Sequence, residues 1–311
     1  MIQGVLWISR QSYGMLTIGH VPFLWVLLFY FMTGLWIWKK NGQNRHIRIS
    51  LAYVIMIILI WIPMARRKSL AFLDVGQGDC FVADTKSGAI IFDGGSSSED
   101  QVGRYRILPY MKYLGYQKIQ IAVISHMDID HYSGIKELLE MGKIKYLGLP
   151  EIPKDETMKK IIGIAKKRGT TIFYLSRGRQ ITTKDGSLKV LHPQKNSRME
   201  KNAASLVMQG KILGYRVLLT GDVEKEGEEE LLSEELERAD ILKVAHHGSK
   251  NSTSNEFLQK VQPKQTVISC GKQNRYGHPH LETIHRLQTY HTKIYRTDRS
   301  GAIIFFKRRD G

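Results

Sequence analysis

The stretch Ser125-His126-Met127-Asp128-Ile129-Asp130-His131 groups two histidines and two aspartates within six residues. It closes the apolar run IQIAVIS (119–125), which predicts a buried strand. Grouped polar side chains at the end of a buried strand need a partner that offsets the loss of their hydration. The stretch therefore predicts a metal site, whose candidate ligands are His126, Asp128, Asp130 and His131.

Two later stretches end in the same way. The apolar run YRVLLTGD (215–222) ends at Asp222, and ILKVAHHGS (241–249) ends with His246 and His247. Taken alone, each of these groups also suits an ordinary turn. Together with the first stretch, they supply enough histidine and aspartate for two divalent metals about 3.5–4 Å apart that share a bridging carboxylate.

The residues around these stretches predict an α/β domain over 68–311. The runs SLAFLDV, DCFVADT and GAIIFDGG are separated by glycine turns, which is typical of a meander of antiparallel strands. Strands then alternate with helices that we expect to begin near Ser133 and to cover 154–168 and 224–238. Locally paired strands followed by such alternation indicate two sheets with helices outside, an α/β sandwich.

Residues 1–67 have a different composition, which is typical of a membrane segment. Residues 1–65 contain five Lys and Arg and no acidic residue. Apolar runs predict two transmembrane helices, at about 17–38 and 49–65. The loop 39–48 has one more basic residue than the segment just after the second run, which favours a cytoplasmic loop. We therefore expect a multi-pass protein of the cell membrane whose α/β domain is extracellular.

Composition narrows the classes of function. Two cysteines, Cys80 and Cys270, exclude a disulfide scaffold and are too few for a cysteine-rich zinc site. The net charge is +17, of which five charges lie in residues 1–65, so residues 66–311 carry the other 12. Such an excess favours a polyanionic substrate, which basic side chains would contact through phosphates. A basic protein surface beside anionic lipid is the alternative explanation.

The order of these motifs resembles the metallo-β-lactamase superfamily. The sequences DVGQGD (74–79), SHMDIDHYSG (125–134), LKVAHHGSKNST (242–253) and NRYGHPH (274–280) narrow the likeness to the C-terminal domain of the ComEC family of DNA-uptake proteins. The likeness covers about 68–306 and implies an αββα sandwich. Residues 1–65 are similar to the end of that family's membrane competence domain, whose remainder is absent, so we expect a fragment or a truncated form.

The resemblance implies two divalent metal ions, manganese or zinc. The first would bind His126 and Asp128, and the second Asp130, His131 and His246, with Asp222 as the bridge. Asp128 stands where most of the superfamily has a second histidine, and a carboxylate there makes manganese a competitor of zinc. His247 is the less favoured of the two adjacent histidines. We assign it, with Asp74, Asp79 and Asp93, to the residues that support the ligands or form turns.

One departure from the superfamily concerns the first metal. The usual histidine on the loop before the strand that ends at Asp222 has no counterpart in KNAASLVM (201–208), where Asn202 and Ala203 are nearest. His192 lies ten residues earlier, and the sequence assigns it no role.

The expected activity is that of a metal-dependent phosphodiesterase or nuclease acting on DNA, single- or double-stranded, during uptake across the membrane. Asp130 would orient the attacking hydroxide, and His278 would contact the phosphate or donate a proton, with His280 as a further candidate. The expected partners are DNA, membrane lipid and other proteins of the competence machinery. The alternatives are a DNA-guiding module without catalysis and a hydrolase of small esters.

Overall fold

The computed structural model describes residues 19–38, 50–55, 67–199, 202–234 and 236–308. The chain divides into two units, Met1–Arg66 with Lys112–Gln117, and Arg67–Met111 with Lys118–Gly311. Each unit is considered by itself.

The first unit contains helix α2, Phe23–Trp38, and a helical stretch over 50–55. The 16 residues of α2 extend about 24 Å at 1.5 Å per residue, short of the roughly 30 Å of a hydrocarbon core. In the described ranges no helix is both long and apolar enough to cross a membrane. The predicted span over about 17–38 is therefore not supported. Most of the predicted span over 49–65 lies outside the described residues.

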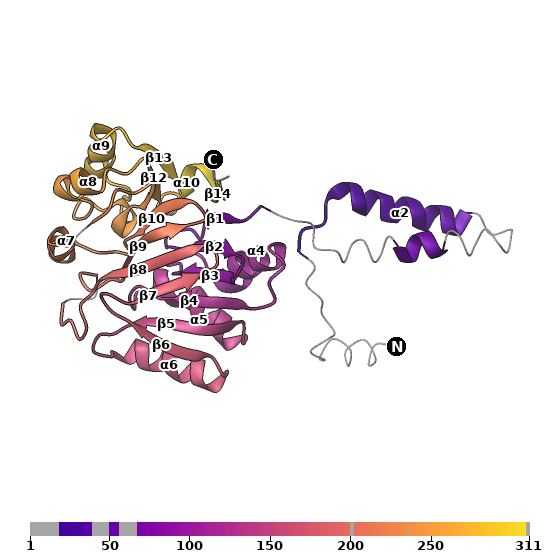
Figure 1. The fold of residues 1–311 in the computed structure, drawn as a ribbon, viewed down its shortest axis with the longest axis horizontal. Coiled ribbons are helices and arrows are strands. Elements are labelled where there is room, and N and C mark those ends of the chain that lie inside the picture. Colours follow the sequence, from indigo (N-terminus) through magenta and orange to yellow (C-terminus); the bar gives the residue numbers. More distant parts are fainter. Residues whose placement is uncertain (1–18, 39–49, 56–66, 200–201, 235, 309–311) are drawn as a thin grey trace. The chain divides into compact units, whose positions relative to one another are not determined.

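The second unit is built on two seven-stranded mixed sheets, which face each other with helices on both sides (Figure 1). The first sheet has the order β14-β1-β2-β3-β4-β5-β6 and the second the order β13-β12-β11-β10-β9-β8-β7. The predicted αββα sandwich is confirmed. The strands of the first sheet are β14 (Ile303–Phe306), β1 (Ser69–Phe72), β2 (Phe81–Thr85), β3 (Gly88–Phe92), β4 (Ile119–Val123), β5 (Ile144–Pro150) and β6 (Thr171–Leu175). Those of the second are β13 (Lys293–Arg296), β12 (Gln265–Ile268), β11 (Ile241–Lys243), β10 (Tyr215–Leu219), β9 (Val207–Ile212), β8 (Gly186–His192) and β7 (Gln180–Thr183).

Successive side chains of a strand point to opposite faces of the sheet, so they contribute to two separate apolar cores. In β10, Val217 and Leu219 pack between the sheets, whereas Leu218 packs toward the outer helices. Both sets are apolar because the strand is covered on both faces. The strands β1, β2 and β3 pair antiparallel as the glycine-separated runs predicted, and β3 to β6 pair parallel.

Helices cover the outer face of each sheet. The helices and helical turns are η1 (Gly103–Ile107), α4 (Leu108–Tyr113), α5 (Ile129–Glu140), α6 (Glu156–Lys167), α7 (Lys225–Leu232), η2 (Ala245–Gly248), α8 (Asn255–Val261), α9 (Leu281–Thr289) and α10 (Thr297–Ser300). Two predicted boundaries are wrong. Helix α5 begins at Ile129 and not near Ser133, and α7 ends at Leu232 and not at 238.

The parallel strands of both sheets direct their carboxyl ends toward one place. Strand β3 leads to Asp93, β4 leads to His126, β10 leads to Asp222, and β11 leads to His247. In α/β sheets, the loops that follow the carboxyl ends of strands are the usual place of a ligand site. The topology therefore places the residues singled out in the sequence along one edge of the sandwich.

Candidate metal centre

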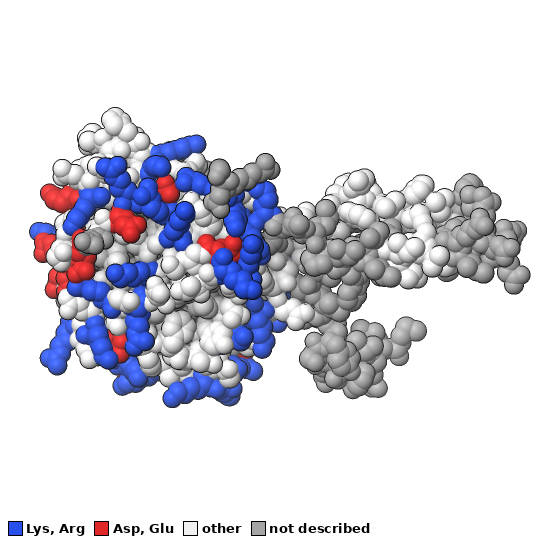
Figure 2. All heavy atoms as spheres, viewed as in Figure 1, with Lys and Arg blue, Asp and Glu red and all other residues white. Residues whose placement is uncertain are grey.

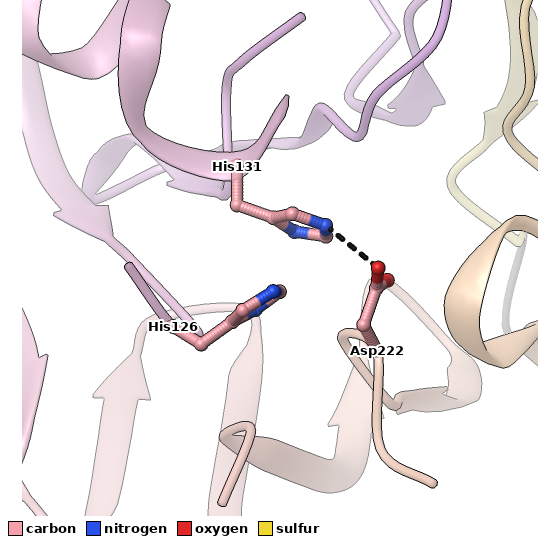
Figure 3. A group of neighbouring side chains, drawn as sticks. All are labelled: His126, His131 and Asp222. Carbon is pink, nitrogen blue, oxygen red and sulfur yellow. Dashed lines mark ion pairs between the residues drawn. The ribbon is translucent and has the colours of Figure 1, made fainter. Parts of the chain in front are cut away.

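Three buried side chains from two segments about ninety residues apart form the middle of the site. His126 follows β4, His131 lies in the first turn of α5, and Asp222 follows β10. Their side chains point toward one another (Figure 3), and the potential ligand atoms of the three lie within 4.8 Å of each other. His131 Nε2 is 3.2 Å from Asp222 Oδ2.

Two imidazoles are fixed through Nδ1 by partners on the outer side of the site. Nδ1 of His131 lies 2.9 Å from Asp93 Oδ2, and Nδ1 of His247 donates to the carbonyl oxygen of Ser269 at 2.9 Å. An Nδ1–H that is engaged in this way leaves Nε2 as the acceptor or the metal ligand. Both Nε2 atoms face the site, and neither makes a hydrogen bond within the described part of the chain.

His126 is held in a comparable way by hydroxyl groups. Its Nδ1 lies 3.0 Å from Ser125 Oγ and 3.2 Å from Ser205 Oγ. Ser205 Oγ also accepts a hydrogen bond from the amide of Asp222 at 3.2 Å. Nε2 of His126 is buried without a hydrogen bond among the described residues. The hydroxyl of Ser205 thus links the side of the site near His126 to Asp222.

His247 meets both carboxylates of the site. Its Nε2 is 3.3 Å from Asp222 Oδ2 and 3.4 Å from Asp130 Oδ2. His246 and His247 are consecutive non-glycine residues at positive φ, 48° and 52°. Such backbone is costly, and it occurs where the surrounding structure imposes a functional orientation. Here it directs the buried His247 side chain into the site.

The donor set fits two divalent cations. Imidazole nitrogen and carboxylate oxygen are the ligands that zinc and manganese accept. Buried polar atoms without partners are rare in folded proteins and call for an explanation. The sets of potential ligands whose atoms lie within 4.8 Å of one another are His126, His131 and Asp222; Asp130, His131 and His247; Asp79, Asp222 and His247; and Asp79, Asp93 and His131.

Electrostatics supports the same assignment. Although burial opposes the charged form, Asp222 and Asp93 hold the pKa of His131 well above its usual value. Burial likewise opposes ionisation of Asp222, but His131 and His247 hold its pKa well below the usual range. The carboxylates therefore stabilise positive charge at the place where the imidazole nitrogens meet, which is the environment that a bound cation requires.

Lys243 is a residue of the site that the sequence analysis missed. It lies at the end of β11 and is 4% exposed. Its ammonium group pairs with Asp79 and lies 3.8 Å from Asp222 Oδ1. Buried lysines are nearly always paired, so the lysine inside the apolar run ILKV indicates that a buried acidic partner lies nearby. The sequence carried no comparable signal for Ser205.

The other residues assigned from the sequence fall into two groups. Asp128 lies near the site, with Oδ2 3.7 Å from His126 Nε2, and His246 lies at the rim, with Nε2 3.8 Å from Asp222 Oδ2. His246 Nδ1 is also 2.9 Å from Glu224 Oε1. The geometry thus favours His247 over His246 as the candidate ligand beside Asp130, whereas the sequence-based prediction prefers His246.

Asp74 and His192 take no part in the cluster. Asp74 Oδ1 accepts a hydrogen bond from Gly76 N, so it forms a turn. His192 Nε2 lies 2.7 Å from Ala203 O, and His192 Nδ1 lies 3.2 Å from Glu230 Oε2. Burial lowers the pKa of His192, which favours its neutral form. His192 therefore supports the loop that contains Ala203 and does not replace the missing histidine.

A pocket of about 250 Å³ opens onto the cluster. It receives candidate ligands from both halves of the fold and side chains from the segment after β12. The lining residues are Gln77, Ser97, Asp128, Ile129, Asp130, Asp222, His246, His247, Tyr276 and His278. The structure thus brings His278 to the same opening as Asp130, as the catalytic roles predicted for these two residues require.

Replacing Asp93 by asparagine is expected to weaken metal binding about 10- to 100-fold. Asparagine tolerates the positive φ of 56° at this position. Its carbonyl can accept from Ser125 N as Asp93 does, which turns the amide NH₂ toward His131 Nδ1. That imidazole would then carry its proton on Nε2, the wrong tautomer for a ligand. Calorimetric titration of the metal-free protein with Mn²⁺ or Zn²⁺ measures the effect, and unchanged affinity would contradict it.

Comparisons with known proteins agree with the fold and the motifs. The family model described as the metallo-beta-lactamase superfamily matches residues 73–272. The chain is similar to ComE operon protein 3 of Bacillus subtilis, with 35% identity over 294 residues, 88% of this chain and 38% of that protein. It is similar to competence protein ComA of Neisseria gonorrhoeae, with 30% identity over 245 residues, 76% and 32% of the two chains. The chain thus spans about a third of the length of these relatives.

Among solved structures, the metallo-beta-lactamase fold protein YhfI of Bacillus subtilis superimposes with a TM-score of 0.52. The two share 12% identity, and the match covers 76% of this chain and 99% of YhfI. At this identity the likeness concerns the fold alone.

Proposed function

The chain belongs to the metallo-beta-lactamase superfamily, and from that premise we propose that it is a metal-dependent phosphodiesterase that cleaves DNA. The observation that carries the proposal is the convergence of three buried imidazole Nε2 atoms, each without a hydrogen bond among the described residues, on Asp222 and Asp130. The likeness to competence proteins, which the sequence motifs predicted, supports DNA as the substrate.

The residues divide into two ligand sets around Asp222. His126 and Asp128 would hold the first ion, Asp130, His131 and His247 the second, and Asp222 would lie between them. Bound divalent ions supply a hydroxide at neutral pH and polarise the phosphoryl oxygen.

Asp130 is suited to orient the attacking group. Although burial opposes its ionisation, the adjacent imidazoles of His247 and His131 lower the pKa of Asp130, so the carboxylate is ionised at neutral pH. It lines the pocket, where it can accept a hydrogen bond from an attacking water or hydroxide and hold its direction of attack.

His278 faces the same pocket and has a different task. Burial, together with His247, His246 and His280, lowers the pKa of His278 to about 4. The imidazole is therefore neutral at pH 7, and it can donate one N–H to a phosphoryl oxygen without carrying a positive charge. Of the two roles expected from the sequence, we propose the phosphate contact.

Surface charge favours a polyanionic substrate. Figure 2 shows Lys and Arg side chains spread over the visible face of the α/β domain, with acidic side chains in smaller groups. Phosphate contacts of this kind add affinity without reading the base sequence. Hydrolysis of a small ester would not need them.

The test is a cleavage assay on the full chain, stripped of metal and then supplied with Mn²⁺ or Zn²⁺, with labelled single- and double-stranded DNA. Replacing Asp130 by alanine is expected to lower cleavage at least about 100-fold. DNA binding is expected to change less than about twofold, because surface phosphate contacts are untouched. The exposed Asp100 provides the control, since Asp100→Ala removes the same charge outside the pocket. Full cleavage by Asp130→Ala would refute the assignment.

A DNA-guiding module without catalysis is the second candidate. It is favoured by the loop before β9, where the sequence has no counterpart of the usual superfamily histidine and the hydroxyl of Ser205 lies 3.2 Å from His126 Nδ1. Binding of DNA without cleavage under either metal would support this candidate.

The place of action remains a prediction from the sequence and from the likeness to competence proteins. We expect the α/β domain to lie on the external side of the cell membrane. We also expect it to contact membrane lipid and other proteins of the competence machinery.

A further inference from the structure

An exposed aromatic side chain stands at the rim of the metal pocket. Tyr276 lines the pocket, yet its side chain is 43% exposed. On its inner side it stacks with His278, with ring centroids 5.7 Å apart and planes inclined by 23°. Ile129, from the other half of the fold, lines the same pocket and is 54% exposed. Large apolar side chains at a polar opening indicate contact with a flat, apolar part of a ligand.

The segment that presents Tyr276 is well anchored. Asn274 Nδ2 donates to Gly271 O at 2.9 Å and to His278 O at 2.6 Å, and Asn274 Oδ1 accepts from His278 N at 3.0 Å. These bonds close the turn beneath Tyr276. The ring is therefore exposed but held in position, which keeps the entropy cost of stacking a ligand on it low.

Arg275 adds a cation beside the ring. Its guanidinium lies 4.9 Å from the centroid of Tyr276 and donates to Tyr276 Oη at 2.7 Å. Both side chains are exposed, and an exposed cation–π contact is weaker than the stack of a nucleobase on an aromatic ring. A base can therefore displace the guanidinium from the ring, and the guanidinium can then pair with a neighbouring phosphate.

We propose that Tyr276 is the platform on which a nucleobase of the substrate strand stacks, so that the adjacent phosphodiester enters the metal pocket. The inference rests on the proposed function and adds a positioning residue to it. The pocket volume of about 250 Å³ is below the roughly 300–1,000 Å³ of most small-molecule sites. It suits a phosphodiester and its sugar, and leaves the base at the rim. Stacking on a π-face tolerates every base.

The experiment compares two labelled strands, an octamer of thymidine nucleotides and an octamer of abasic tetrahydrofuran nucleotides, which share their backbone charge. Tyr276→Ala is expected to weaken binding and kcat/KM for the thymidine strand about 10-fold, down to the level of the abasic strand. For the abasic strand the same variant is expected to match the wild type. Tyr276→Phe, which keeps the ring, is expected to retain most of the preference. Tyr105→Ala removes a tyrosine that is 63% exposed and is not among the residues lining the pocket, and it is expected to change neither strand.

Two outcomes would overturn the proposal. An equal loss on both strands would show that Tyr276 acts only through its packing on His278, and no loss on either strand would show that it does not contact the base. Failure of the proposed function would be recognised differently, as absence of cleavage of any strand by the wild type with either metal. In that case the binding comparison, made on the metal-free protein, still decides the role of Tyr276.

Discussion

Replacing Asp222 by asparagine is expected to lower metal-dependent cleavage about 1,000-fold. Asp222 Oδ2 lies 3.2 Å from His131 Nε2 and 3.3 Å from His247 Nε2, and Asp222 is also grouped with His126, so both ligand sets depend on one carboxylate. Asparagine has nearly the same shape, but it removes the negative charge that holds the pKa of both imidazoles well above the usual value. The metal content of the purified protein and its cleavage rate in Mn²⁺ and Zn²⁺ measure the effect.

The matched control is Asp240→Asn. Asp240 is equally buried, at 4% exposure, and it pairs with Lys264 at 3.0 Å, but it is in none of the candidate ligand sets among the described residues. This variant is expected to lose some stability and to keep its metal and its cleavage when measured below its unfolding temperature. If Asp222→Asn retained the metal content and rate of the wild type, the bridging role would be excluded.

Replacing Lys243 by methionine is expected to lower the free energy of unfolding of the metal-free protein by about 3–5 kcal/mol. The ammonium group is buried, pairs with Asp79 and donates to Gly221 O at 3.4 Å. Although burial opposes its charge, Asp79 and Asp222 raise the pKa of Lys243, so the folded protein holds it charged. Methionine fills a similar volume but removes this ammonium group from beside the two buried carboxylates. Urea denaturation without added metal measures the loss.

Lys211→Met serves as the control for this substitution. Lys211 is an exposed lysine of β9, so its replacement is expected to change stability by no more than about 0.5 kcal/mol. The double variant Asp79→Asn with Lys243→Met should lose less than the sum of the two single variants, because the two groups interact directly. A loss below about 1 kcal/mol for Lys243→Met would show that the carboxylates do not depend on this ammonium.

Much of the fold could be predicted because short apolar runs bounded by glycine turns indicate strands from local sequence alone. The runs SLAFLDV (69–75), DCFVADT (79–85) and GAIIFDGG (88–95) contain β1, β2 and β3. The sequence predicts the start of α5 too late because the first turn of the helix contains Asp130 and His131, which interrupt the apolar pattern. Its buried Ile135, Leu138 and Leu139 begin the recognisable pattern only later.

The candidate site could be predicted only in part. The acidic and histidine side chains at strand ends were visible, but the choice between His246 and His247 was not. That choice depends on the direction of two side chains in a turn with φ of 48° and 52°, and adjacent residues of the same type give no local sign of it. Ser205 and Lys243 became part of the site only through contacts with residues far away in the chain.

A cluster of candidate metal ligands could be predicted from local sequence alone, because the short stretch from His126 to His131, Asp222 and the paired histidines place imidazoles and carboxylates at the ends of apolar runs. Which of these groups meet depends on the packing of the whole domain. Asp93 follows β3, His131 lies in α5 and Asp222 follows β10, and they lie together only because the two sheets pack face to face with the carboxyl ends of their parallel strands at one edge. Distances across that edge depend on packing between the sheets, which local sequence patterns do not specify.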